Sequence, residues 1–139
     1  MGQDLVFGII INMKTILVDA IDGIVLKDGK LFQEMFEMLE NFPNRKIVLT
    51  GANDEQFKQF NLDKVPYEVF TLKHNPEKTD PKYFEIMLNK YGLQNDEVVF
   101  FEHNLEAVKS AEKAGIKTYY YDSAKRDITS LKAFLSSSI

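Results

Sequence analysis

The sequence predicts a three-layer α/β/α sandwich built around a parallel β-sheet. Strand-like and helix-like stretches alternate along the chain in the order β-α-β-α-β-α-β-α-β-α, which is the pattern of an α/β fold. Most of the predicted strands are continuously apolar, as expected for parallel strands that are covered on both faces. The chain has 139 residues, of which 45% are hydrophobic and 27% are charged. This length and composition fit one well-packed domain and disfavour wholesale disorder.

The first half of the chain predicts a strand, a turn, a helix, a second strand and a second helix. Residues 15–18 (TILV) are apolar and partly β-branched, which indicates a buried strand. The glycine-containing segment 19–30 predicts a turn with a small hairpin. Apolar residues recur at helical spacing over 31–42. The second strand is predicted over 46–49 (KIVL), and an Asn-Asp pair opens the second helix, 53–60.

The second half continues this alternation, and its helix ends are more clearly marked. Residues 67–72 alternate in polarity and predict the third strand. The next helix is predicted over 81–91. Asp80 suits its N-cap, Pro81 its first helical position and Gly92 its C-terminal end. The remaining predicted elements are strand 97–101, helix 104–114, strand 117–121 and helix 127–135.

Composition excludes several kinds of chemistry. The chain has no cysteine, so disulfides, thiolate metal sites and cysteine nucleophiles are ruled out. The chain contains two histidines, His74 and His103, and their separation in sequence disfavours a histidine zinc site. The net charge of −4 offers no electrostatic footprint for nucleic acid.

No stretch of the sequence is long and apolar enough to predict a membrane span. The apolar stretch 6–11 is far shorter than the ~20 residues that a spanning helix needs, and it lacks the charged start of a signal peptide. A cytoplasmic protein is therefore expected. Residues 1–12 are interpreted as an N-terminal extension of unknown role, and residues 13–139 as a single domain.

Polar residues follow several of the predicted strands. In a parallel α/β sheet, ligands bind outside the carboxyl ends of the strands, so these residues are expected to converge on one crevice. Carboxylates, a hydroxyl and an ammonium group in that place suit an oxygen nucleophile, a phosphate and a hard cation with oxygen ligands. The residues are Asp19, Asp22, Thr50, Gly51, Lys78, Glu102, His103, Asn104, Asp122 and Ser123.

The order of these residues resembles that of the haloacid dehalogenase-like (HAD) hydrolase superfamily. An apolar strand is followed by Asp, the next by Thr, Lys-x-Asp-Pro precedes a helix, and a later apolar strand is followed by Glu and a helix. The resemblance covers residues 14–122 and is most specific over 77–120. It implies a Rossmann-like sheet and phosphate-ester hydrolysis.

The resemblance also implies a role for each matched residue. Asp19 matches the nucleophile that accepts the phosphoryl group, and Thr50 with Gly51 the site that binds its oxygens. Lys78 matches the lysine that neutralises charge on nucleophile and phosphate. Glu102 matches an acidic residue that helps to hold Mg²⁺ together with Asp19. Physically this is covalent catalysis by a carboxylate with cations placed against a developing phosphoryl charge.

The chain departs from the family pattern in its first and fourth motifs. The family carries a second aspartate two residues after the nucleophile, as general acid/base, but Ile21 stands there. Asp22 comes one residue later, so either the loop bulges to present it or the acid/base is lost. Counting back from Gly23 would instead place Ala20 at the nucleophile position. In the fourth motif His103 replaces an acidic residue and Asn104 replaces a serine. A neutral imidazole is a poor ligand for Mg²⁺, which prefers oxygens, so the metal site is expected to be weakened.

These observations favour a weak phosphomonoesterase that uses Asp19 as nucleophile and Asp22 as acid/base. The first alternative is a catalytically degenerate protein that binds a ligand or a protein partner. The second is a metal-independent dehalogenase-type hydrolase, because Asp19-Ala20 resembles the start of the dehalogenase motif. The intervals between Asp19, Thr50 and Lys78 are too short for an inserted cap domain. The open crevice suits a small phosphorylated substrate or a protein partner, and the sequence leaves a homodimer open.

Overall fold

The computed structural model describes residues 13–139. The expected N-terminal extension, residues 1–12, lies outside the described residues. Within the described part of the chain, no helix combines the length and the apolar character needed to cross a bilayer.

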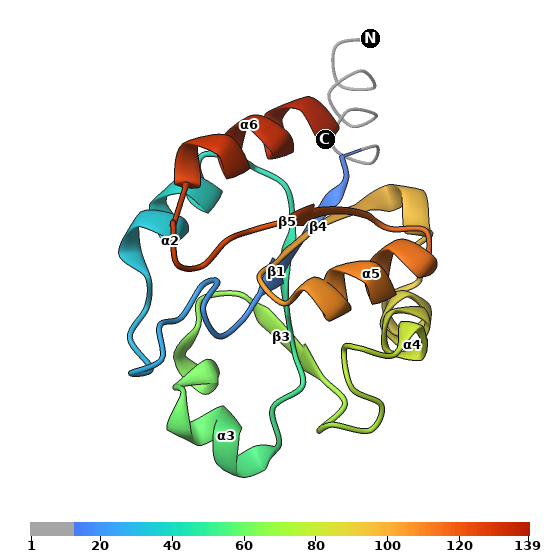
Figure 1. Cartoon of the computed structure of the whole chain (residues 1–139), viewed down its shortest axis with the longest axis horizontal. Helices are drawn as coiled ribbons and strands as arrows, with labels where there is room; N and C mark the ends of the chain where they lie inside the picture. The colour runs from blue at the N-terminus through green and yellow to red at the C-terminus, as the bar shows by residue number, and fades with distance from the viewer. Residues whose placement is uncertain (1–12) are drawn as a thin grey trace, which may run out of the picture.

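The centre of the molecule is a five-stranded sheet in which every strand pairing is parallel (Figure 1). The strand order is β3-β2-β1-β4-β5. The chain builds outward from β1 (Thr15–Asp19) through β2 (Lys46–Thr50) to β3 (Glu68–Thr71). It then crosses back to place β4 (Val98–Glu102) on the other side of β1, with β5 (Lys117–Tyr120) outside it. The order therefore reverses at β1, which is where an open parallel sheet leaves a crevice for a ligand.

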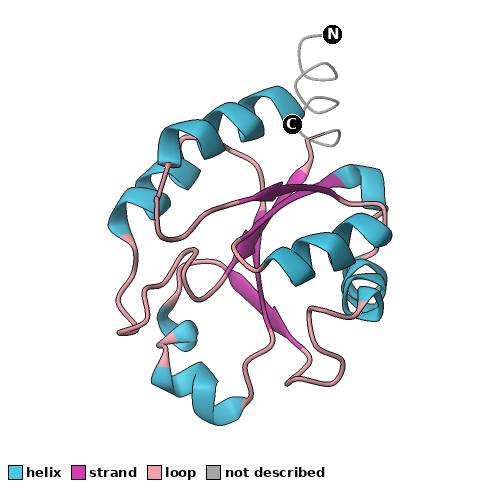
Figure 2. Cartoon of the chain, viewed as in Figure 1, coloured by secondary structure: helices cyan, strands magenta, loops and turns pink. Residues whose placement is uncertain are grey.

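Helices cover both faces of the sheet, which confirms the predicted three-layer α/β/α sandwich (Figure 2). Helices α2 (Gln33–Glu40) and α6 (Ile128–Ser138) contact each other on one face. Helices α4 (Pro81–Tyr91) and α5 (Leu105–Lys113) contact each other on the opposite face. Helix α3 (Asp54–Gln59) follows β2. The two short 3₁₀ helices are η1 (Leu62–Lys64) and η2 (Asn95–Glu97).

The two faces of β1 enter two separate apolar clusters. Ile16 and Val18 lie in the cluster beneath α2 and α6, whereas Leu17 lies in the cluster beneath α4 and α5. Every residue of β1 is buried, including Asp19 at its end. Because side chains alternate along a strand, a strand buried on both sides is continuously apolar, which is the pattern found in the sequence.

Several element boundaries differ from the prediction. Helix α2 begins at Gln33 instead of residue 31, because Phe32 is extended and its N–H donates to the carbonyl of Ile24 at 2.8 Å. The hairpin expected over 19–30 is reduced to isolated bridges inside a longer turn. Helix α6 continues to Ser138, three residues beyond the predicted end. The predicted limits of α4 are correct, with Asp80 as N-cap and Gly92 in the left-handed conformation at its end.

Candidate active site

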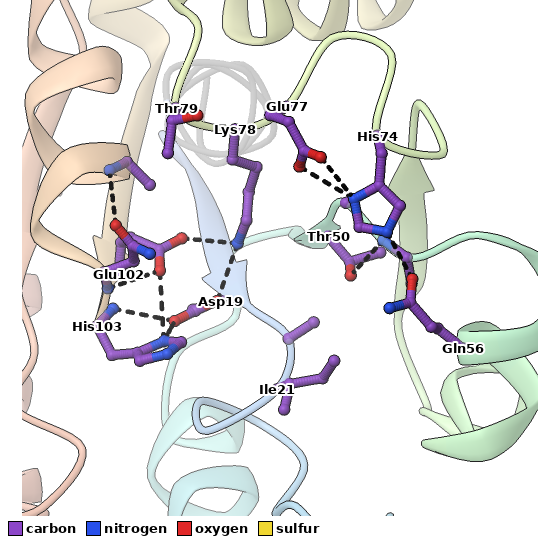
Figure 3. Close-up of a pocket in the computed structure, with 15 residues that line it drawn as sticks. Asp19, Ile21, Thr50, Gln56, His74, Glu77, Lys78, Thr79, Glu102 and His103 are labelled. Atoms are coloured by element: carbon purple, nitrogen blue, oxygen red, sulfur yellow. Dashed lines mark hydrogen bonds and ion pairs between the residues drawn. The ribbon is translucent and has the colours of Figure 1, made fainter.

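A pocket of about 210 Å³ opens at the carboxyl ends of β1, β2 and β4 (Figure 3). It brings together most of the strand-end residues expected from the sequence. The lining residues are Asp19, Ala20, Ile21, Thr50, Gly51, Ala52, Gln56, His74, Glu77, Lys78, Thr79, Glu102, His103, Asn104 and Ala107. Asp122 and Ser123 do not line it, because β5 is an edge strand and Asp122 instead accepts hydrogen bonds within its own turn.

The centre of the pocket is an ion cluster formed by Asp19, Lys78 and Glu102. Asp19 ends β1 with 1% of its surface exposed, and Glu102 ends β4 fully buried. The Lys78 ammonium donates to Asp19 Oδ1 at 3.0 Å and to Glu102 Oε1 at 2.6 Å. Its third donor reaches the carbonyl of Leu49 at 3.2 Å. One lysine therefore compensates two buried carboxylates, and it does so from the loop that precedes α4.

The cluster keeps its acid and base groups charged. Burial raises the pKa of Asp19, but the Lys78 ammonium and the hydrogen bond from His103 outweigh it and hold that pKa well below its usual range. Burial lowers the pKa of Lys78, but the carboxylates of Asp19 and Glu102 outweigh it and raise that pKa. Asp19 is thus a carboxylate at neutral pH, as a nucleophile must be.

His103 is held by three carboxylates. Its backbone N–H donates to Asp19 Oδ2 at 3.0 Å, and ring atom Nδ1 is hydrogen-bonded to the same oxygen. Nδ1 also lies 3.3 Å from Glu102 Oε2, and Nε2 lies 3.8 Å from Asp22 Oδ2. The hydrogen bonds with Asp19 and Glu102 raise the pKa of His103 to about 10.

Raising the pH is expected to remove part of the stability that His103 provides. A group with a higher pKa in the folded state contributes fully below its unfolded pKa, near 6.5, and loses that contribution as the pH rises through about 10. Denaturant titrations of the wild type should therefore show a lower free energy of unfolding at the alkaline end of this range. His103→Gln should show a smaller decrease, whereas an equal decrease in both proteins would assign the effect to other groups.

Thr50 and Gly51 form the wall across from this cluster. Thr50 is buried, and its Oγ1 accepts the N–H of Ala52 at 3.1 Å, which leaves the hydroxyl proton available to a ligand. The hydroxyl of Tyr83 donates to the carbonyl of Thr50 at 2.7 Å and anchors this strand end. A Cβ at Gly51 would lie 3.3 Å from His74 Nδ1, so glycine lets the neighbouring loop approach closely.

The turn after β1 places Ile21, and not Asp22, in the pocket. The turn closes through hydrogen bonds from the N–H of Gly23 to Ala20 O and from that of Ile24 to Asp19 O, at 3.1 and 3.0 Å. Its tightness requires glycine, since a Cβ at Gly23 would lie 2.2 Å from Asp19 O. Ile21 lines the pocket, whereas Asp22, at φ 66°, is not among the lining residues. The side chain of Asp22 lies between Lys27 and the far side of His103.

Asn104 has a structural role at the start of α5. Its side-chain oxygen accepts the N–H groups of Glu106 and Ala107 at 3.0 and 3.2 Å, so it is the N-cap of α5. Its own N–H donates to Glu102 Oε2 at 2.9 Å. Asn104 therefore orients the buried carboxylate through its backbone.

The sequence did not predict a second polar group in the pocket, which His74 forms with Glu77 and Gln56. His74 Nδ1 lies 3.0 Å from Glu77 Oε2, and Nε2 contacts Gln56 Oε1 from α3. Lys73 and His74 both have positive φ, 53° and 65°, which turns the loop after β3 toward the pocket. The only sequence signal for this group was the presence of one of the two histidines shortly before Lys78. The position of His74 in the sequence does not show whether its side chain points into the pocket.

The donor set does not fit magnesium. One ligand atom each from Asp19, Glu102 and His103 lie within 4.8 Å of one another, so the groups do converge as the metal prediction requires. However, Mg²⁺ prefers an octahedron of oxygens, and the third group is an imidazole. The carboxylate oxygens that face this imidazole, Asp19 Oδ2 and Glu102 Oε2, already accept N–H groups from His103 and Asn104.

No family model matches the chain, and no curated protein matches it in sequence. Solved structures resemble it in fold. A conserved haloacid dehalogenase-like protein of unknown function from Agrobacterium tumefaciens gives a TM-score of 0.61 at 15% identity, over 77% of this chain and 60% of its own. A HAD family enzyme from Bacteroides thetaiotaomicron gives 0.57 at 13% identity, over 78% of this chain and 93% of its own. That enzyme is an aspartate-to-alanine mutant in complex with magnesium and inorganic phosphate.

The core domain of a proposed phosphoglycolate phosphatase from Streptococcus pneumoniae gives a TM-score of 0.58 at 14% identity, over 89% of this chain and 96% of its own. The chain spans about half (46%) of the UTR4 protein of Saccharomyces cerevisiae, which it also resembles in structure. Identities this low establish a shared fold and leave the activity to be argued from the pocket itself.

Proposed function

We propose that this chain, which has the haloacid dehalogenase-like fold, is a slow hydrolase of small phosphate monoesters with good leaving groups. The observation that carries the proposal is the ionised Asp19 at the switch point of the sheet, held by Lys78 with an apolar side chain, Ile21, beside it. The pocket supplies a nucleophile and a cation but no carboxylic acid at the position of Ile21.

In the first proposed step, Asp19 attacks the phosphorus of the ester. Asp19 Oδ1 accepts one hydrogen bond from the described residues, that of Lys78, and so keeps a lone pair for attack. A new O–P bond forms to Asp19, and the P–O bond to the leaving group breaks. The leaving group departs with the electron pair as an anion. Lys78 and the Thr50 hydroxyl are placed to stabilise the negative charge of the phosphoryl oxygens.

In the second proposed step, water hydrolyses the aspartyl phosphate and returns Asp19 as a carboxylate with release of inorganic phosphate. The water supplies one proton to phosphate and, through the solvent, one to the departed anion, so the net reaction is ester hydrolysis. A positioned general acid/base contributes ~10²–10⁴-fold in such reactions. Without one at position 21, both steps are slow unless the leaving group is stable as an anion.

No step of the proposed reaction uses a metal. The resemblance predicted magnesium, and the Bacteroides enzyme is in complex with magnesium and inorganic phosphate. In this chain the carboxylate oxygens that face His103 already accept N–H groups. The cations already in the pocket, Lys78 and His103, are the groups available to offset phosphoryl charge.

The proposal is tested by comparing leaving groups. The purified full chain is assayed with an aryl phosphate, an acyl phosphate and an alkyl phosphate, each with magnesium and with a chelator. We expect turnover of the first two at least about 10²-fold above the alkyl ester, because only the alkoxide needs a proton to leave. Acid quenching and intact-mass spectrometry should detect a phosphoryl adduct, which Asp19→Asn should lack. Equal rates for wild type and Asp19→Asn would contradict the nucleophilic role.

A second candidate function is binding of a phosphorylated ligand without turnover. The observation that favours it is Ile21, since an apolar side chain at this position cannot donate a proton to the leaving group. Calorimetric binding of an alkyl phosphate, together with no turnover of any ester, would select this candidate. A 2-haloacid assayed in parallel tests the dehalogenase alternative, whose product would be the hydroxy acid and halide.

A further inference from the structure

We propose that the His103 side chain takes the place of a divalent metal between Asp19 and Glu102, so that this pocket needs no metal. The ring occupies the gap between the two carboxylates, from β1 and β4. Nδ1 is hydrogen-bonded to Asp19 Oδ2 and lies 3.3 Å from Glu102 Oε2. A metal bridging these carboxylates would have to displace that ring.

The two oxygens that face His103 already accept hydrogen bonds from the protein. Asp19 Oδ2 accepts both the backbone N–H and the ring N–H of His103. Glu102 Oε2 accepts the N–H of Asn104 at 2.9 Å and is also near the His103 ring. The opposite oxygens of both carboxylates share the Lys78 ammonium. A carboxylate oxygen has two lone pairs, so Asp19 Oδ2 has none left for a metal, and the remaining lone pair of Glu102 Oε2 faces the His103 ring.

The charge of the cluster is also balanced without a metal. Both ring nitrogens of His103 face carboxylates, Nδ1 toward Asp19 and Nε2 toward Asp22 at 3.8 Å, and both positions favour a proton on nitrogen. The Lys78 ammonium and the His103 ring therefore both face the two buried carboxylates. A divalent ion would add positive charge beside an ammonium group that already satisfies both acids.

The test replaces the imidazole of His103 by a carboxylate, the kind of ligand that a magnesium site requires. Thermal unfolding of the wild type, His103→Asp and Asn104→Asp is followed during a magnesium titration at constant ionic strength, with calorimetry alongside. We expect no magnesium-dependent shift in the wild type. His103→Asp should gain saturable magnesium binding by calorimetry, and a rise in Tm of about 3–6 °C when magnesium exceeds its Kd tenfold.

Asn104→Asp is the matched control, because it adds a carboxylate one residue away and keeps a good N-cap for α5. It should behave like the wild type. Saturable magnesium binding by the wild type, or by all three proteins equally, would overturn the proposal.

A second measurement keeps the proposal testable if His103→Asp does not fold. Nitrogen-15 spectra of the wild-type imidazoles should show His103 ring signals that are unchanged by magnesium. A shift of these signals on adding magnesium would overturn the proposal. Both measurements report metal binding, so a failed assay for hydrolysis leaves them interpretable.

Discussion

Ile21→Asp is expected to increase the rate of alkyl phosphate hydrolysis by about 10²–10⁴-fold, the usual contribution of a positioned general acid/base. Ile21 lines the pocket together with Asp19, the proposed nucleophile, and follows it by two residues in the same turn. A carboxyl group there would lie next to the carboxylate of Asp19. Because a nearby like charge disfavours ionisation, the new group should keep a proton that it can donate to a leaving group. Steady-state kinetics with aryl and alkyl esters measure the change.

The control for this substitution is Ile21→Asn, because asparagine has nearly the same shape as aspartate but transfers no proton. It should leave the alkyl phosphatase rate at the wild-type value, and only Ile21→Asp should add an ionisation to the pH-rate profile. The gain should be larger for the alkyl ester than for the aryl ester, since only the former depends on an acid. No gain in Ile21→Asp, combined with a loss in Asp22→Asn, would mean that Asp22 already supplies the proton.

Lys78→Met is expected to lower the free energy of unfolding by about 3–5 kcal/mol, the usual cost of leaving buried charges without a partner. Asp19 and Glu102 are both almost fully buried, and the Lys78 ammonium contacts each of them. Methionine matches the length of the lysine stem but supplies no donor. Two acids would then lie close together, partly compensated by His103 alone. Denaturant titration at neutral pH measures the loss.

Two companion variants separate this effect from a general loss of packing. Lys82→Met replaces an exposed lysine of α4 and should change stability by less than about 0.5 kcal/mol. Lys78→Met combined with Glu102→Gln should recover part of the loss, because one uncompensated charge has been removed. If Lys78→Met is as stable as Lys82→Met, the ion cluster contributes nothing to the fold.

The fold was predictable because its signals are local. Continuous apolar runs such as 16–18 and 47–49 require burial on both faces, and β1 and β2 are the inner strands that provide it. Helix α4 was predicted with correct limits since an aspartate, a proline and a glycine each satisfy a backbone requirement at its ends. The start of α2 was wrong because the bond from Phe32 to Ile24 depends on a distant turn.

The candidate site was predictable in part for a related reason. Parallel strands end at one edge of the sheet, so the order of Asp19, Thr50 and Glu102 along the chain was enough to expect them in one pocket. Lys78 joins them because α4 begins directly after it. The prediction that Asp122 and Ser123 join them is wrong, since nothing in their local sequence shows that their strand lies at the edge of the sheet.

The sequence by itself determined the α/β class, the strand ends that carry polar groups and the residues that form the ion cluster. These follow from hydrophobic periodicity and from the alternation of strands and helices that makes the strands parallel. Both can be recognised in short stretches of sequence. The tertiary structure alone decided that Ile21 and not Asp22 faces the pocket, that His74 enters it and that His103 lies between two carboxylates. Side-chain direction in a turn depends on close backbone contacts, such as that of Gly23 with Asp19 O, and spacing along the chain does not contain them.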